Sequence, residues 1–354
     1  GFEQISISHE ISPLMKLVGR ADTTVIDAYL SPILKRYVSQ ISSEFDQDHQ
    51  AQLLFMQSNG GLTDANMFRG KDAILSGPAG GVVGMVKTAK IAGFERLIGF
   101  DMGGTSTDVC HYNGQFERSF ETEVAGARVR APMMDIHTVA AGGGSILFFR
   151  DGRLQVGPES AGANPGPACY RRGGPLTVTD CNVLLGKLQP LHFPRVFGAN
   201  ADQPIDVEAV EKSFQEFAEE ISIKTGNKPL SGVELAEGFL RIAVTNMANA
   251  IKKISVQRGY DVTKYALQCF GGAGGQHACL VADALGIETI FIHPFAGVLS
   301  AYGMGLAEIR CMKESQFERP LSAYEEAKVM LSDLSDKATR QVVSQGVRYV
   351  DISV

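Results

Sequence analysis

The sequence predicts an α/β fold with mixed sheets arranged in two lobes. Apolar, strand-like segments alternate with segments of helical spacing along most of the chain. The length of 354 residues exceeds one typical domain, and a hydrophobic content of 44% is enough to bury a large core. The 39 glycines gather in a few clusters, several directly after apolar strands, which indicates places where backbone approaches a ligand.

Composition argues against several classes of partner. The net charge is −6 and no basic run is present, so neither nucleic acid nor an anionic membrane surface is expected as the main partner. No stretch reaches the roughly 18 apolar residues that a membrane span needs, and the N-terminus has no secretory pattern. The six cysteines are scattered without a CxxC pair, as expected for reduced thiols in a cytoplasmic protein.

The elements follow from periodicity and from turn residues. Helices are predicted at 22–46, 76–93, 206–221, 233–258, 297–310 and 323–345. Strands are predicted at the apolar start of 52–61, on both sides of the glycine turn in 95–117, and at 348–354. The stretch 264–293 is predicted as a strand, a glycine loop, a helix and a second strand. The stretch 140–185 is rich in Gly and Pro but also apolar, so ordered loops with short strands are expected there.

The most informative segment is Asp101-Met-Gly-Gly-Thr-Ser-Thr-Asp108, which lies between two apolar strands. Gly103 and Gly104 let backbone amides approach an anion, and Thr105, Ser106 and Thr107 add hydroxyl donors.

Two acidic residues flank this turn. Asp101 is suited to hold Mg²⁺ or to orient an attacking water beside a terminal phosphate, and Asp108 to a supporting or metal role. The alternative is an ordinary hairpin with solvated threonines; the full nine-residue pattern favours a phosphate site. No Walker A lysine follows.

A second cluster runs from Cys269 to His277 and contains Gly271, Gly272, Gly274 and Gly275 after a buried strand. Flat backbone of this kind suits a nucleoside ring, and the spacing lacks the GxGxxG pattern of dinucleotide folds. His277 is equally compatible with a capping, packing or catalytic role.

Two further segments, 76–81 and 297–305, are rich in small residues. They predict helices that cross closely, either as ordinary packing or as a hinge between lobes.

Other candidates carry weaker signals. His137, before a run of three glycines, is a candidate general base, although a structural histidine has the same pattern. Arg171 and Arg172 are candidates for an anion contact or for solvent exposure, and Asp180 is expected to cap the helix that follows it.

Several motifs of the sequence resemble those of known protein families. The segment DMGGTSTDV resembles the second phosphate-binding hairpin of the actin, Hsp70 and sugar-kinase ATPases, and CFGGAGGQHA is similar to their adenosine motif. The segments SGPAGGVVG, AAGGGSI and VGPESAGANPGPACYRRGGPLTVTD resemble the hydantoinase A/5-oxoprolinase family more narrowly, over roughly 20–310. The Gly-Gly-Gln-His form of the adenosine loop is closer to 5-oxoprolinases than to hydantoinases.

The resemblance implies an actin-like (ribonuclease H-like) ATPase fold with an incomplete first lobe. The implied divisions are 1–93 (remainder of the first lobe with a connecting helix), 94–315 (second ATPase lobe) and 316–354 (start of a C-terminal region). The implied cofactors are ATP and Mg²⁺. Gly103, Gly104 and Thr105 would contact the β and γ phosphates, Asp101 would serve Mg²⁺ or the reacting oxygen, and Gly271 to Gly275 would hold the adenosine.

The implied activity is the ATP-dependent opening of a cyclic amide, in 5-oxoprolinases the conversion of 5-oxo-L-proline to L-glutamate. Alternatives are an N-methylhydantoinase, a ketone carboxylase subunit, or a nucleotide switch without amide hydrolysis. The first phosphate hairpin and the hydrolase half of the family are not found in this sequence, so they are expected in the same polypeptide or a second subunit. A homo-oligomer is also compatible. Alone, this segment is expected to show little lactamase turnover and weak ATP binding.

Overall fold

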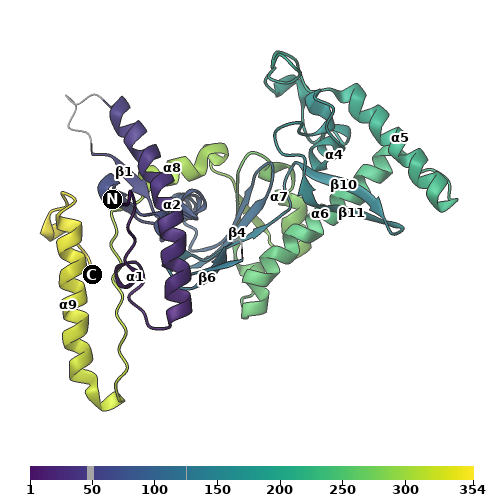
Figure 1. The fold of residues 1–354 in the computed structure, drawn as a ribbon. Coiled ribbons are helices and arrows are strands. Elements are labelled where there is room, and N and C mark those ends of the chain that lie inside the picture. Colours follow the sequence, from purple (N-terminus) through teal and green to yellow (C-terminus); the bar gives the residue numbers. More distant parts are fainter. Residues whose placement is uncertain (46–51, 125) are drawn as a thin grey trace. The chain divides into compact units, whose positions relative to one another are not determined.

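The computed structural model describes residues 1–45, 52–124 and 126–354, which divide into two compact units (Figure 1). The first unit combines residues 1–87, 116–135 and 300–354, and the second combines 88–115 and 136–299. This division differs from the predicted boundaries, because 116–135 and everything after 299 join the first unit.

The second unit is built on a five-stranded mixed sheet. Its strand order is β13–β12–β3–β4–β9, with bounds β13 (Thr289–Phe291), β12 (Ala266–Phe270), β3 (Arg96–Met102), β4 (Thr107–Asn113) and β9 (Ile136–Val139). The first three strands are parallel, and β4 and β9 are antiparallel to their neighbours. A separate hairpin joins β10 (Ser145–Arg150) to β11 (Arg153–Ser160).

Helix α6 (Gly232–Ile254) packs on one face of this sheet, against β4 and β9. Ser231 and Glu234 form a capping box at its start, and its apolar stripe reaches the buried Phe100, Met102 and Val109. The remaining helices of the unit are α4 (Val178–Leu184), α5 (Val207–Thr225) and α7 (Ala278–Leu285). These helices enclose one continuous core with α6, which fixes the sheet rigidly beneath its turns.

The first unit contains more helix and only short strands. Its helices are α1 (Ser8–Ile11), α2 (Leu17–Glu44), α3 (Ser76–Ile91, whose last residues enter the second unit), α8 (Leu299–Leu306) and α9 (Tyr324–Val343). Its strand pairs are β1 (Leu54–Met56) with β2 (Leu62–Asp64), β5 (Arg118–Ser119) with β8 (Met133–Met134), and β6 (Thr122–Val124) with β7 (Ala127–Val129). No described helix is both long and apolar enough to span a bilayer.

Backbone contacts explain why the C-terminal segment belongs to the first unit. Leu62 N donates to Glu308 O at 2.8 Å, and Arg310 N donates to Leu62 O at 3.1 Å. Beyond α9, the buried Gln345 accepts from Asp64 N at 2.8 Å. All three hydrogen bonds join β2 to residues more than 240 positions later, a pairing that sequence periodicity does not indicate.

The predicted helices and the two strands around the 103–106 turn are confirmed, with shifts of a few residues at their ends. The predicted strand at 348–354 is wrong: Tyr349–Asp351 forms a 3₁₀ turn whose Tyr349 and Val350 side chains are exposed. An apolar alternation becomes a strand only where a neighbouring backbone completes its hydrogen bonds, and none does so here among the described residues.

The predicted close crossing of two small-residue helices is confirmed within the first unit. A Cβ added at Gly80 would lie 2.7 Å from Ser300 O, and one added at Gly303 would lie 2.5 Å from Gly84 N and overlap Gly80 O. Only hydrogen fits at these positions of α3 and α8, so the glycines allow backbone to touch backbone. The hinge role stays a prediction.

We expect Gly303→Ala to destabilise the protein by about 1–3 kcal/mol, because the new methyl group overpacks the crossing. Gly305→Ala on the same helix is the matched control: an added Cβ there meets nothing within 4 Å. This control is expected to be neutral or to stabilise by up to about 1 kcal/mol through helix propensity. Chemical unfolding of both variants measures the difference, and equal stabilities would contradict the crossing.

Candidate functional site

Two glycine-rich turns lie side by side at one edge of the second unit's sheet. Strands β3 and β12 run parallel and in register, with Phe270 opposite Asp101. The 103–106 turn follows β3 and the 271–275 loop follows β12. Because parallel strands end at the same edge, the sequence-predicted phosphate and nucleoside segments are brought together.

Direct contacts hold the two turns against each other. Ala273 N donates to Met102 O at 2.9 Å. Gly271 has φ +83°, and a Cβ there would overlap Asp101 Oδ1 and lie 2.5 Å from Met102 O. A Cβ at Gly274 would lie 2.7 Å from Cys269 Sγ. Gly271 and Gly274 therefore permit close packing, whereas Gly272 and Gly275 are exposed and form the open side of the loop.

Peptide planes in the 103–106 turn are oriented by a third glycine segment. Gly143 N donates to Gly103 O at 3.1 Å, and Gly144 N donates to Gly104 O at 2.6 Å. In a trans peptide the C=O and the following N–H point in opposite directions. Fixing these two carbonyls toward 143–144 therefore turns the amides of Gly104 and Thr105 to the other side, where both residues are exposed.

No room remains between the turn and this supporting segment. A Cβ at Gly142 would lie 2.6 Å from Thr105 C, and one at Gly144 would lie 2.9 Å from Gly104 O. Thr179 in turn donates to Gly143 O from both its backbone, at 2.8 Å, and its hydroxyl, at 2.9 Å. The supporting role of residues 142–144 is not predicted from the sequence, although their three successive glycines were a signal for it.

Among the hydroxyl residues of the turn, Thr105 is exposed and Ser106 is half-buried, so both can reach a ligand. Thr107 does not join them. It is fully buried, and its hydroxyl donates to Ala141 O. Its place at the start of β4 points it into the core side of the sheet, so its predicted ligand contact is corrected to a structural one.

Asp101 and Asp108 face each other across β3 and β4. Burial, and then the negative charge of Asp108, raise the pKa of Asp101 to about 6 from 3.8. Burial also raises the pKa of Asp108, opposed by a 2.6 Å hydrogen bond from Thr138. Two partly buried carboxylates with repelling charges are the arrangement expected where a cation or a proton is bound.

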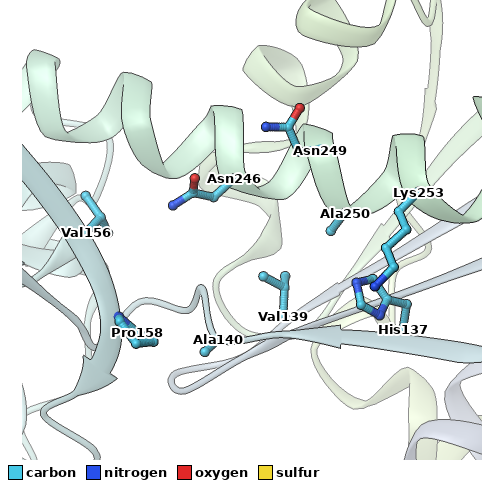
Figure 2. A pocket seen from close by; sticks show the side chains of 9 residues that line it. All are labelled: His137, Val139, Ala140, Val156, Pro158, Asn246, Asn249, Ala250 and Lys253. Carbon is cyan, nitrogen blue, oxygen red and sulfur yellow. The ribbon is translucent and has the colours of Figure 1, made fainter.

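His137 does not join Asp101. It pairs with Val109, one register step away from the Asp108–Thr138 pair, so its side chain points to the opposite face of the sheet. There it lines a cavity of about 430 Å³ with Asn246 and Lys253 of α6 (Figure 2). The predicted general-base role at the phosphate turn has no support in this geometry.

Other candidates from the sequence have structural partners. Asp180 occupies the third helical position in a capping box with Thr177, so it supports the start of α4 rather than being its N-cap. Arg171 forms a 2.6 Å ion pair with Asp206, and Arg172 donates to Gly198 O at 3.3 Å.

His277 is fully buried beside Asn182, with their nitrogens 3.1 Å apart. Burial, with the charge of Lys187, lowers its pKa to about 4, so the ring is neutral at pH 7 and packs beneath the 271–275 loop.

The relationship to known proteins can now be stated. The hydantoinase/oxoprolinase family profile matches residues 20–313. The chain belongs to this family. A 5-oxoprolinase of Dictyostelium discoideum is 45% identical over 98% of the chain, and a 5-oxoprolinase of Saccharomyces cerevisiae is 48% identical over 87%.

Coverage of these relatives is partial. The chain spans 29% of the Dictyostelium protein and 24% of the yeast protein. Among solved structures, the ATP-dependent caprolactamase from Pseudomonas jessenii is 33% identical, with a TM-score of 0.79 over 95% of this chain and 49% of its own. The predicted family is confirmed, as is the α/β fold with a mixed sheet flanked by helices.

We expect Asp101→Asn to stabilise the folded protein at neutral pH. A carboxyl group whose folded pKa lies near 6, above its ordinary 3.8, favours folding only while protonated. Its contribution to the free energy of unfolding therefore falls as pH rises from about 3.8 to about 6, and stays low at every higher pH. The asparagine variant should gain about 2–3 kcal/mol over the native protein between pH 4 and pH 7.5.

Urea unfolding at both pH values measures this gain. Asp151→Asn, at an exposed turn where φ is +52°, is the matched control and should show no pH-dependent gain. An Asp101→Asn variant that is no more stabilised at pH 7.5 than at pH 4 would contradict the assigned burial.

Proposed function

We propose that this chain supplies the ATP-phosphate-binding part of an enzyme that opens a cyclic amide, with 5-oxo-L-proline as substrate and L-glutamate, ADP and phosphate as products. Two lines support the proposal. Relatives named 5-oxoprolinase share 45–48% of its residues, and a structural neighbour is an ATP-dependent caprolactamase. The geometry of the 103–106 turn and of Asp101 also supports it.

The observation that carries the proposal is the orientation of the 103–106 turn. Among the described residues, no acceptor binds the amides of Gly104 and Thr105, and both residues are exposed. Adjacent outward amides form an anion nest, and the Thr105 and Ser106 hydroxyls add donors. Held rigidly, such donors match the charge on β and γ phosphate oxygens without reorganising during the reaction.

ATP coupling has a chemical reason. A five-membered lactam is a stable and poor electrophile. Transfer of the γ-phosphoryl group to its amide oxygen releases ADP and leaves a carbon that water attacks readily. The ring C–N bond then breaks as the nitrogen takes a proton, which gives an acyl phosphate, and a second water hydrolyses this to the carboxylate and phosphate. Catalysis of the transfer consists mainly of positioning and charge stabilisation. Asp101, beside the turn and the 271–275 loop, is placed to accept a proton or to orient the reacting oxygen.

The carboxylates also suit Mg²⁺. Among the described residues no group of three or more acidic, His or Cys side chains forms an all-protein metal cage. Mg²⁺ is commonly bound by one or two carboxylates together with substrate phosphates and water, which is the donor set that Asp101 and Asp108 offer. When bound, the ion neutralises charge on the phosphates.

We propose that the rest of the reaction is carried by further segments of the same polypeptide or by a second subunit: another phosphate hairpin and a hydrolase half. A reducing compartment such as the cytoplasm is consistent with the six cysteines, which are all free thiols.

The test uses the complete protein that contains this chain and measures ADP release with and without 5-oxo-L-proline. Native protein should show oxoproline-dependent release. Asp101→Asn should lower kcat by about 10²–10⁴ because a charged group at the reacting centre is lost. Asp151→Asn should match the native rate.

Any of three outcomes would overturn the proposal, of which the first two concern turnover. One is ATP turnover that ignores 5-oxo-L-proline but responds to hydantoin or acetone, which would indicate a hydantoinase or a carboxylase. The other is full activity in the Asp101→Asn variant. Nucleotide-dependent closure without amide hydrolysis would instead indicate a switch.

A further inference from the structure

The first unit contains a second site, a cavity of about 610 Å³. It is lined by the β1–β2 turn, the 69–72 loop, the extended segment 310–314 and the end of α9. Its volume lies in the range of small-molecule sites. Every lining residue belongs to the first unit, so the cavity is distinct from the 103–106 turn.

Positive charge exceeds negative charge in the cavity wall. The basic residues are Arg69, Lys71, Arg130, Arg310, Lys313 and Arg340. The acidic residues are Glu10, Asp72 and Glu314. The wall therefore carries a formal excess of three positive charges (6 − 3) in a chain whose net charge is −6. Such a local reversal indicates an anionic ligand.

Three of these cations have no side-chain partner among the described residues. Lys71 pairs with Asp72 at 2.8 Å, and Arg130 pairs with Glu121 at 3.0 Å. Across the part of the chain that the structure describes, Arg69, Arg310 and Lys313 form no side-chain hydrogen bond or salt bridge. A guanidinium that has no protein partner inside a polar cavity is available to a carboxylate.

A second arginine, Arg118, lies close enough to Arg310 to feel its charge. Arg118 Nε donates to Asn59 O at 3.0 Å, while its buried Nη2 has no hydrogen-bond partner. Burial, and then the like charge of Arg310, lower the pKa of Arg118. Two like charges that lower each other's stability are costly, and an anion bound beside them would offset that cost.

Backbone and amide contacts fix Arg310 in place. Gln57 Nε2 donates to Arg310 O at 3.2 Å, and Asn59 Nδ2 donates to Gln57 Oε1 at 3.3 Å. Gly61, whose N–H donates to Asn59 Oδ1 at 2.8 Å, leaves room for Arg310, since its own Cβ would overlap the arginine Cβ. Gln57 and Asn59 are themselves buried in the wall, so the cavity is preorganised rather than a loose surface.

We propose that this cavity binds a small carboxylate of amino-acid size, with Arg310 as the binding group and Arg118 as a positioning residue. The planar guanidinium matches a carboxylate in two parallel hydrogen bonds. The acidic wall residues Asp72 and Glu314 suit N–H donors on the same ligand and disfavour a compact phosphate dianion. The cavity shares no residue with the 103–106 turn or the 271–275 loop, so the proposal goes beyond the function proposed above.

Calorimetric titration of the complete protein, without nucleotide, tests the site with L-glutamate, 5-oxo-L-proline and inorganic phosphate as probes. At least one carboxylate should bind, and more tightly than phosphate. Arg310→Gln should weaken that binding at least tenfold, and Arg310→Lys less so, because it keeps the charge but not the fork.

A second substitution in the cavity and a control outside it keep the test decisive if the Arg310→Gln variant folds poorly. Arg69→Gln changes an exposed side chain of the same cavity and should weaken binding several-fold. Arg36→Gln, an exposed arginine of α2 outside the cavity, is the matched control and should bind as the native protein does.

No carboxylate binding, tighter binding of phosphate, or carboxylate binding unaffected by both cavity variants would each overturn the proposal. ATP binding measured on the same samples separates this failure from a failure of the proposed function.

Discussion

The orientation of the 103–106 turn depends on two backbone hydrogen bonds, from the amides of Gly143 and Gly144 to the carbonyls of Gly103 and Gly104. Each bond fixes one peptide plane, and each plane then directs its N–H away from the support. The amides that we propose as anion donors are thus oriented by Gly143 and Gly144, far along the chain. Any side chain at Gly142 would push the turn out of place, since its Cβ would lie 2.6 Å from Thr105 C.

Strand register decides which side chains share the site. Asp101, Asp108 and Thr138 are aligned across three strands and lie on the face opposite the packed α6 helix. Thr107 and His137 are the neighbours of Asp108 and Thr138 along their strands. Because successive side chains of a strand point to opposite faces, these two lie on the α6 side of the sheet. The site keeps two carboxylates partly buried and close together, which disfavours their charged forms. Such a cost to stability is common where a group must bind a cation or exchange a proton.

Local patterns in the sequence predicted much of this fold. The helices show clear periodicity, and Asp101–Asp108 contains its own strand ends and turn, so the two strands and the turn between them could be located without a structure. The roles of Thr107, His137 and Gly142–Gly144 could not be predicted in the same way, because each depends on register or on contact with a distant segment. The 348–354 segment shows the same limit, since its pattern suits a strand that has no neighbour to pair with.

The most direct test is a structure of the complete protein with ADP and a γ-phosphate mimic. The account predicts phosphate oxygens within hydrogen-bond distance, about 2.7–3.2 Å, of the Gly104 and Thr105 amide nitrogens. It also predicts that the 271–275 loop lies against the nucleoside. Phosphates bound elsewhere, with both amides facing solvent, would contradict it.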